Sequence, residues 1–387
     1  MGREHRLEII QEIEEQRNSN VVTYITSDRA PISAQITEDA VLPLYRHLLA
    51  IAKANTGKDK IDLFIYSRGG DVSVPWRIVS MIREFCDEFS VLIPYRAQSA
   101  ATMISMGADS IIMGRKAELG PIDPTLNRRV SGEASTPPAE ISVEDVSSYI
   151  SFMRERANIS DQSALATVVS ELANHLTPLT LGSVNRTYSH IRLVARKLLS
   201  SRKDKIDEER ISAIVEALTE KIYFHGHAIA RKEAKELRLP VEFADDGLED
   251  LIWNLYEEYD SLLQFTSPID PEQLLSSKNT DECTIGDYSA AIIESVNRLD
   301  SFEGMASFKR RRAIPSNIAI NLNMPITGID QNQLPDTAQA MIQHVMQQVT
   351  QAIPLLVQQE LARQCPIQGY EIKYIGAKWL DRTSQPI

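Results

Sequence analysis

The sequence contains few of the features that fix a chain covalently or bind a metal. It has only three cysteines among 387 residues, Cys86, Cys283 and Cys365, and they are far apart and odd in number. This spacing excludes a disulfide framework and the paired cysteines of a zinc site. No HExxH, CxxC or GxxxxGK motif occurs, so no motif indicates a metal ion or a nucleotide. We therefore expect no metal and no cofactor, and the cysteine content fits a reducing, cytoplasmic compartment.

The sequence also lacks a long apolar run and an excess of positive charge. Its longest uncharged stretch, residues 337–359, carries seven glutamines, a histidine and a proline, which a bilayer core would penalise. Residues 1–17 are charged throughout, unlike a signal peptide. The formal net charge is −12, and phosphate backbones and anionic membranes repel such a surface. We therefore expect neither nucleic acid nor a membrane as a partner, and we interpret the basic run 309–312 as ion-pair partners or a solvated loop.

Strand-like and helix-like segments alternate through the first third of the chain. Apolar β-branched runs predict strands at residues 21–26, 61–67, 91–96 and 110–113. Apolar residues at helical spacing predict helices at 6–17, 40–54, 78–89 and 99–106. Strand, helix and strand in succession indicate βαβ units with right-handed crossovers, and hence a parallel sheet. The predicted fold class is therefore α/β.

The rest of the chain has a different pattern. Residues 126–142 have the composition of a mobile loop, and residues 143–237 are mainly helical in pattern. A polar segment with prolines, 266–280, is a candidate linker. Beyond it, the strand-like runs 318–324 and 370–376 flank a helical segment at 336–363, which indicates a smaller α+β part. The predicted domains are 1–265, a linker at 266–280, and a C-terminal domain of unknown role at 281–387.

Two short motifs follow neighbouring predicted strands, at the sheet edge where α/β proteins place their ligands. Ser67-Arg68-Gly69-Gly70-Asp71 follows one strand, and Ala97-Gln98-Ser99-Ala100-Ala101-Thr102 follows the next. A serine in the first turn of a helix, among small neighbours, can act as a nucleophile, and the backbone N–H groups of Gly70 and Ala100 can form an oxyanion hole. Each motif alone also fits a plain turn or a helix N-cap. The chemical interpretation therefore rests on the order and spacing of the two motifs together.

The chain resembles a known family in this region. The strings YSRGGDVSVPWRIVSMIREF and VLIPYRAQSAATMISMGADSIIMGRKAELGPIDP are similar to the serine dehydrogenase proteinase family, whose members are related to signal peptide peptidase A and to the Clp protease proteolytic subunit. The resemblance extends over residues 5–265. It implies a ClpP/crotonase-like spiral of ββα units with a helical outer layer, a homo-oligomer, and serine peptidase activity on peptides or proteins. By the family pattern Ser99 would be the nucleophile, and Gly69, Gly70 and Ala100 would form the oxyanion hole.

The general base departs from the family pattern. In the Clp subunit a catalytic histidine follows the nucleophile, whereas the corresponding segment here offers Asp123. The region that supplies the triad aspartate in the Clp subunit offers His225 and His227. We therefore predict that acid and base have exchanged places, with His225 or His227 as the base of Ser99 and Asp123 as the orienting carboxylate, because triad roles are geometric and independent of chain order.

Other residues compete for the role of base. Signal peptide peptidase A-type enzymes use a lysine, and Lys197 lies in a helical stretch where a solvated lysine is the simpler interpretation. His190 is a further candidate. The two histidines at 225 and 227 equally fit a helix cap or an interface.

Three functions follow from these residues. The first is an ATP-independent serine endopeptidase that acts through an acyl-enzyme at Ser99. The second is a catalytically inactive scaffold that keeps the fold and has lost the base. The third is acyl-thioester chemistry on coenzyme A substrates, which a crotonase-type oxyanion hole also serves.

Overall fold

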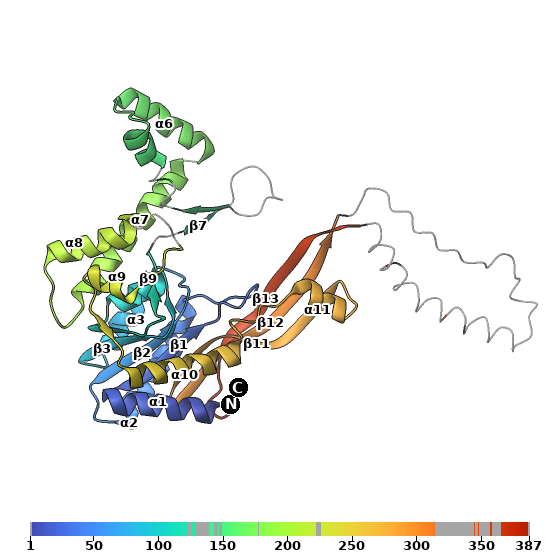
Figure 1. The fold of residues 1–387 in the computed structure, drawn as a ribbon. Helices are drawn as coiled ribbons and strands as arrows, with labels where there is room; N and C mark the ends of the chain where they lie inside the picture. The colour runs from blue at the N-terminus through green and yellow to red at the C-terminus, as the bar shows by residue number, and fades with distance from the viewer. Residues whose placement is uncertain are drawn as a thin grey trace, which may run out of the picture. The chain divides into compact units, whose positions relative to one another are not determined.

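The fold is built around an eight-stranded sheet (Figure 1). The computed structural model describes residues 2–122, 125–128, 139–142, 149–176, 178–221, 226–313 and 365–385, together with the single residues 146, 344, 347 and 357. The strand order is β10-β5-β3-β2-β1-β11-β12-β13. The bounds of these strands, in chain order, are β1 Asn20–Thr26, β2 Lys60–Tyr66, β3 Glu88–Ile93, β5 Ser110–Met113, β10 Val241–Phe243, β11 Glu282–Ser295, β12 Arg298–Arg312 and β13 Ile367–Asp381.

Five neighbouring strands of this sheet are parallel, and β11 pairs antiparallel with β1. The parallel strands are nearly continuous apolar runs because both faces of the sheet are covered by helices. On one face, Val21 and Phe64 pack in a cluster with α1 (Arg3–Arg17) and α10 (Asp246–Leu263). On the other face, Val22 and Leu63 pack in a second cluster. The helices of that second face are α2 Val41–Ala54, α3 Val74–Arg83, α4 Ala100–Met106 and α7 Pro178–Ser200.

Pairs of strands repeat along the chain, and each pair contributes one strand to the large sheet and one to a small sheet. After β3 the chain forms β4 (Arg96–Ala97) and helix α4, and after β5 it forms β6 (Glu118–Leu119). The short strands β4 and β6 join β9 (Ile229–Ala230) in a separate sheet of order β4-β6-β9. This is the ββα repeat that the sequence resemblance implies, and the predicted α/β class is confirmed.

The remaining elements complete the outer part of the fold. Short strands β7 and β8 pair with each other, and mainly helical elements follow them, as the sequence predicts for residues 143–237. These elements are the 3-10 turn η1 Glu38–Ala40, strands β7 Thr125–Arg128 and β8 Ala139–Ser142, the π-helical turns η2 Phe152–Arg156 and η3 Ala217–Lys221, and helices α6 Gln162–His175, α8 Glu208–Glu216, α9 Arg231–Glu236 and α11 Pro271–Ser277.

Several predicted boundaries are wrong. The helix predicted at 78–89 ends at Arg83, and the apolar Phe89 belongs to β3, because the backbone N–H groups of Asp87 and Glu88 already bond to Asp59 at the start of the sheet. The ends of the predicted loop 126–142 pair as β7 and β8. The predicted strand at 318–324 lies outside the described residues, as does nearly all of the helical segment at 336–363.

The chain divides into two compact units, and the division differs from the predicted domains. The first unit comprises Met1–Ile269, Asp287–Gly304 and Gly376–Ile387, and the second comprises Asp270–Gly286 and Met305–Ile375. Parts of the predicted C-terminal domain 281–387 therefore group with the first unit, because β11 pairs directly with β1. The predicted linker 266–280 contains helix α11.

The second unit contains the basic run of residues 309–312. Each of its four side chains forms an ion pair with a carboxylate of the same unit, at distances of 2.8 to 3.1 Å. Their partners are Glu272, Asp281, Glu282 and Glu371. The run therefore consists of ion-pair partners, one of the two interpretations that the sequence allows.

Candidate functional site

Ser99 has a backbone conformation that is rare for a serine. It lies directly before α4, with φ 50° and ψ −113°, and its side chain makes no hydrogen bond that caps the helix. A non-glycine residue in the positive-φ region costs on the order of 1–3 kcal/mol and persists where the surrounding structure imposes it, often at functional sites. A helix N-cap has ordinary extended angles and a bonded side chain. The plain N-cap interpretation of Ser99 therefore does not describe this residue.

Gly69 lies directly against the Ser99 turn. Its φ is 107°, and a Cβ added at Gly69 would lie 2.7 Å from Ser99 Cβ, 2.8 Å from Gln98 O and 3.1 Å from Ala100 N. No L side chain fits at such distances. The first glycine of the Gly-Gly pair is thus required both by its backbone angle and by the close approach of the serine turn.

Gly70 is held in place by backbone pairing with Ile36. Ile36 N–H donates to Gly69 O at 2.8 Å, and Asp71 N–H donates to Ile36 O at 2.8 Å. In a trans peptide the C=O and the N–H point in opposite directions, so the N–H of Gly70 points away from Ile36. The N–H of Ala100, in the first turn of α4, has no acceptor within its own helix. Ala100 directly follows Ser99, and Gly70 follows Gly69, which contacts the serine turn.

Buried hydroxyl groups hold the two turns in place. Ser67 Oγ accepts from Gly69 N at 3.0 Å, and Ser67 is also paired with the β4 segment, since its N–H donates to Arg96 O at 2.9 Å. Thr102 Oγ1 lies 2.7 Å from Ala97 O and 2.9 Å from Gly120 O. These two side chains join the glycine turn, the serine turn and the end of β6.

A chain of charged and polar side chains connects the same two turns. Arg68, which precedes Gly69, donates through Nε to Asp28 at 2.7 Å, and Arg96 donates through Nη1 to the same carboxylate oxygen at 3.0 Å. Arg96 Nε also lies 3.2 Å from Glu118 Oε1, which accepts from Gln98 Nε2 at 3.2 Å. Gln98 precedes Ser99. We call Arg68, Asp28, Arg96, Glu118 and Gln98 the bridging network.

The predicted triad partners are only partly described. Asp123 and His225 lie outside the described residues. His227 lies two residues before β9, which pairs antiparallel with β6, so its end of the small sheet is the end at which β4 runs into Ser99. Its ring Nε2 lies 2.8 Å from Glu233 Oε1. The side chain of His227 is 43% exposed and that of Glu233 is 36% exposed. The described carboxylate partner of His227 is therefore Glu233.

The two other residues that compete for the role of base, Lys197 and His190, lie on α7. Lys197 is exposed, and its ammonium lies 5.6 Å from the centroid of the Trp76 ring. This cation–π contact fits the interpretation of Lys197 as a solvated lysine. His190 is exposed on the same helix.

A serine–histidine–aspartate grouping occurs among the buried residues and is closed to substrate. His47 Nδ1 lies 2.8 Å from Ser295 Oγ, and His47 Nε2 lies 3.1 Å from Asp300 Oδ2. All three residues are at most 1% exposed. We interpret this grouping as a structural tie between α2 and the strands β11 and β12.

Sequence reasoning missed most of the residues that support the site. Ile36, Asp28 and Glu233 have no motif of their own. Ile36 and Asp28 reach the site through contacts with distant segments, and Glu233 reaches it through its bond to the nearby His227. Ser67 and Thr102 lie inside the two motifs. Hydroxyl side chains often bond to nearby backbone groups, so the sequence does carry a signal for these two residues.

Among the described residues, no group of three or more histidine, cysteine, aspartate or glutamate side chains is arranged to hold a metal ion. No helix in the described part of the chain has the length and the apolar character needed to cross a membrane.

Comparison with known proteins finds sequences similar to this chain. Two relatives are uncharacterised proteins of Methanocaldococcus jannaschii. One is 29% identical over 261 residues and covers 66% of this chain and 78% of the relative. The other is 26% identical over 243 residues and covers 61% of this chain and 71% of the relative.

Solved structures with similar folds include two proteases. A mutant of the 1510-N membrane-bound stomatin-specific protease is 15% identical, with a TM-score of 0.37 over 60% of this chain and 83% of that chain. ClpP1 from Listeria monocytogenes is 15% identical, with a TM-score of 0.32 over 62% of this chain and 98% of that chain. Both TM-scores are below 0.5, and the fold is therefore described from the strand order and register of this chain alone.

The match to a protein family covers the strands and turns that form the site. The family model of the ClpP-like SDH-type serine proteinases matches residues 2–147. This range includes both glycines, Ser99 and the whole bridging network. The resemblance predicted from the sequence is thus confirmed, and residues 2–147 of this chain are similar to the ClpP-like SDH-type serine proteinases.

Proposed function

We propose that the protein is an ATP-independent serine endopeptidase that forms an acyl-enzyme at Ser99. The observation that carries the proposal is the positive φ of Ser99, without a capping bond, in direct contact with Gly69. A strained turn from strand to helix exposes a serine hydroxyl for attack, and the family match supports a ClpP-like serine protease. The sequence has no nucleotide-binding motif, so an unfolding ATPase would be a separate chain.

The reaction follows from the groups around Ser99. Its Oγ attacks the carbonyl carbon of the scissile peptide while a base takes the hydroxyl proton. The carbonyl oxygen becomes negative, and the N–H groups of Gly70 and Ala100 donate to it. Collapse of this intermediate releases the amine, which takes up the proton, and leaves an ester on Ser99. Water then attacks the ester by the same steps and regenerates the hydroxyl.

We propose His227 as the base, with Glu233 as its orienting carboxylate. The bond of 2.8 Å between His227 Nε2 and Glu233 Oε1 leaves Nδ1 to face a nucleophile. The pairing of β9 with β6 brings this histidine to the same end of the small sheet as Ser99. The alternative is the assignment first predicted from the sequence, in which His225 or His227 is the base and Asp123 is its orienting carboxylate.

Labelling of the intact protein with a fluorophosphonate probe tests the nucleophile. We expect the parent protein to be labelled and Ser99→Ala to lose the label. Ser73→Ala is the matched control, because Ser73 also precedes a helix without a capping bond but has an ordinary φ of −81°. Labelling that does not depend on Ser99 contradicts the peptidase and favours the scaffold. Coenzyme A retained by the purified protein would favour thioester chemistry.

Cleavage of casein tests the base. We expect His227→Ala to slow cleavage by on the order of 10²- to 10⁴-fold, the usual contribution of a general base. Parental rates in both His227→Ala and His225→Ala would remove the proposed triad.

Light scattering on the same samples tests the homo-oligomer that the family resemblance implies, since a monomer would have a mass of 43.4 kDa.

A further inference from the structure

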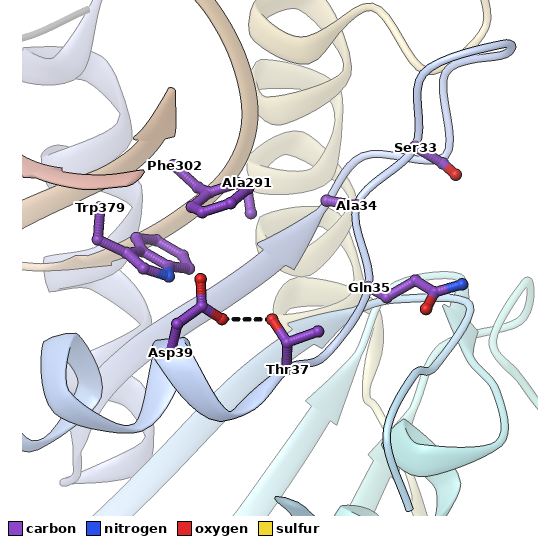
Figure 2. A pocket seen from close by; sticks show the side chains of 8 residues that line it. All are labelled: Ser33, Ala34, Gln35, Thr37, Asp39, Ala291, Phe302 and Trp379. Carbon is purple, nitrogen blue, oxygen red and sulfur yellow. Dashed lines mark hydrogen bonds between the residues drawn. The ribbon is translucent and has the colours of Figure 1, made fainter. Parts of the chain in front are cut away.

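A pocket with a volume of about 250 Å³ opens beside the segment that pairs with Gly70 (Figure 2). Its eight described lining residues belong to the first unit and come from the chain before α2 and from β11, β12 and β13. They are Ser33, Ala34, Gln35, Thr37, Asp39, Ala291, Phe302 and Trp379. The volume lies below the range of about 300–1,000 Å³ that small-molecule sites occupy, so it suits a single side chain.

The lining has the chemistry of a site for a cation. Asp39 is the only charged residue of the eight, and the hydroxyl of Thr37 donates to one of its carboxylate oxygens. The rings of Phe302 and Trp379 lie 5.4 Å apart between centroids. Aromatic rings attract ammonium and guanidinium groups, and the alkyl stems of lysine and arginine pack well on apolar surface. A carboxylate then pairs with the charged end of such a side chain.

One buried polar group lies in the wall of the pocket beside Asp39. The indole Nε1 of Trp379 is buried and has no hydrogen-bond partner among the described residues. Figure 2 shows this nitrogen on the side of the ring that faces the Asp39 carboxylate. The pocket therefore has a carboxylate and a hydrogen-bond donor beside its aromatic wall.

The pocket has a defined position relative to Ser99. Ile36 is fully buried, so the side chains of its neighbours Gln35 and Thr37 point to the opposite face, where they line the pocket. Ile36 pairs with Gly70, and the Gly70 turn in turn lies beside Ser99. The steps from Ile36 to Gly70 and from Gly70 to Ser99 are each about one strand spacing of 4.8 Å, so the pocket segment lies about 10 Å from Ser99. An extended peptide covers this distance in about three residues.

We propose that this pocket binds a lysine or arginine side chain of the peptide substrate, about three residues from the scissile bond. This inference rests on the proposed peptidase activity and names the class of substrate that the site prefers. Acidic side chains are repelled by Asp39, and a neutral side chain gains the aromatic contact alone.

Mass-spectrometric mapping of the bonds cleaved in casein tests the preference. We expect lysine and arginine to be enriched three residues from the cleaved bond on one side. Asp39→Asn should lose this enrichment, and Asp39→Lys should shift it toward glutamate and aspartate. Glu38→Gln is the matched control, because Glu38 is the neighbouring exposed carboxylate and does not line the pocket. A cleavage pattern that is the same in Asp39→Lys and the parent protein overturns the proposal.

A binding measurement separates this proposal from the peptidase itself. Full-length Ser99→Ala protein cannot form the acyl-enzyme, and saturation-transfer NMR can detect weak binding of N-acetyl-lysine amide to it. We expect transfer to the lysine side chain that is lost on adding Asp39→Asn, and no transfer to N-acetyl-glutamate amide. Absence of lysine binding overturns the pocket whether or not casein is cleaved. Binding without any Ser99-dependent cleavage keeps the pocket and overturns the peptidase.

Discussion

The contact between Gly69 and Ser99 sets the geometry of the site at the scale of single residues. The glycine has a positive φ, and its missing Cβ is the space that the Ser99–Ala100 peptide occupies. The serine has a positive φ of its own, which directs its side chain away from a capping position. Each residue thus requires the unusual backbone of the other.

Replacing Gly69 with alanine should separate the two turns. The new Cβ would clash with Ser99 Cβ and Gln98 O, and the backbone angle of 107° is itself unfavourable for alanine. We expect Gly69→Ala to lose on the order of 1–3 kcal/mol of unfolding free energy and about 100-fold in the rate of fluorophosphonate labelling. Urea unfolding and timed labelling measure the two effects.

Gly114→Ala is the control for this substitution. A Cβ at Gly114 would meet only the side chain of Glu249, with the nearest atom at 3.6 Å, which is ordinary contact. Both quantities should therefore stay close to those of the parent protein. Similar labelling rates for the two glycine variants would contradict the role of Gly69.

At the scale of elements, the bridging network joins four separate segments. Asp28 follows β1, Arg68 follows β2, Arg96 belongs to β4 and Glu118 belongs to β6. Asp28 is the central acceptor, since two arginines and the hydroxyl of Tyr66 donate to it. The network therefore holds the ends of these strands in one register beside the site.

Loss of the charge at Asp28 should loosen the glycine turn relative to the serine turn. We expect Asp28→Asn to lower the rate of fluorophosphonate labelling about tenfold, because small displacements of reacting groups are costly. Asp28→Glu, which keeps the carboxylate, should restore part of the rate. Asp246→Asn removes another arginine partner, that of the exposed Arg115, and should leave the rate unchanged. Equal rates in Asp28→Asn and the parent would show that Asp28 has no positioning role.

At the scale of the whole molecule, a buried ion pair connects β11 to the N-terminal helix of the first unit. Glu294 accepts from Arg6 Nε at 2.8 Å and from the hydroxyl of Tyr259 at 2.8 Å. Arg6, Tyr259 and Glu294 are at most 1% exposed. These bonds join α1, α10 and β11, three elements that lie far apart in the sequence.

Breaking this pair should be much more costly than replacing it. Glu294→Gln leaves the guanidinium of Arg6 buried without a charged partner, and we expect a loss of about 3–5 kcal/mol of unfolding free energy. The double variant Arg6→Leu and Glu294→Leu removes the two fully buried charges and should recover much of this loss, with only the partly exposed Arg3 left without its bond to Glu294. Urea unfolding of the parent and the variants measures the difference. A double variant that is less stable than Glu294→Gln would contradict this account.

The buried His47 predicts a pH dependence of stability. Burial lowers the pKa of His47 below its ordinary value, against the opposing effect of Asp300. The unfolded chain therefore takes up a proton near pH 6.5 that the folded protein does not bind. This contribution to stability is complete above about pH 6.5 and is lost as the pH falls, by up to about 1.4 kcal/mol per pH unit.

Unfolding free energies at pH 7, 6 and 5 measure this contribution. We expect the parent protein to lose stability on acidification more steeply than His47→Gln, which has no titrating group at this position. The other histidines are common to both proteins, so their effects cancel in the comparison. Equal slopes would show that His47 titrates normally in the folded state.

Most of the parallel sheet was predictable because its signals are local. The runs at residues 21–26, 61–67 and 110–113 are apolar and β-branched over a few consecutive positions, and each forms a strand within one residue of its predicted bounds. The helix predicted at 78–89 was too long, because the apolar spacing continues past Arg83 into the strand residue Phe89. Spacing alone cannot show where an apolar stripe passes from helix to strand.

The sequence by itself determined that an α/β fold places Ser99 and Gly69-Gly70 after neighbouring strands. Residue order and side-chain periodicity act over a few positions, and they suffice for this. Only the tertiary structure decided that Ile36 pairs with the Gly69-Gly70 turn, that Glu233 lies beside His227, and that β11 extends the main sheet. The bond between Ile36 and Gly69 joins residues 33 positions apart, and the pairing of β11 with β1 joins residues more than 200 positions apart, so neither leaves a pattern in the local sequence.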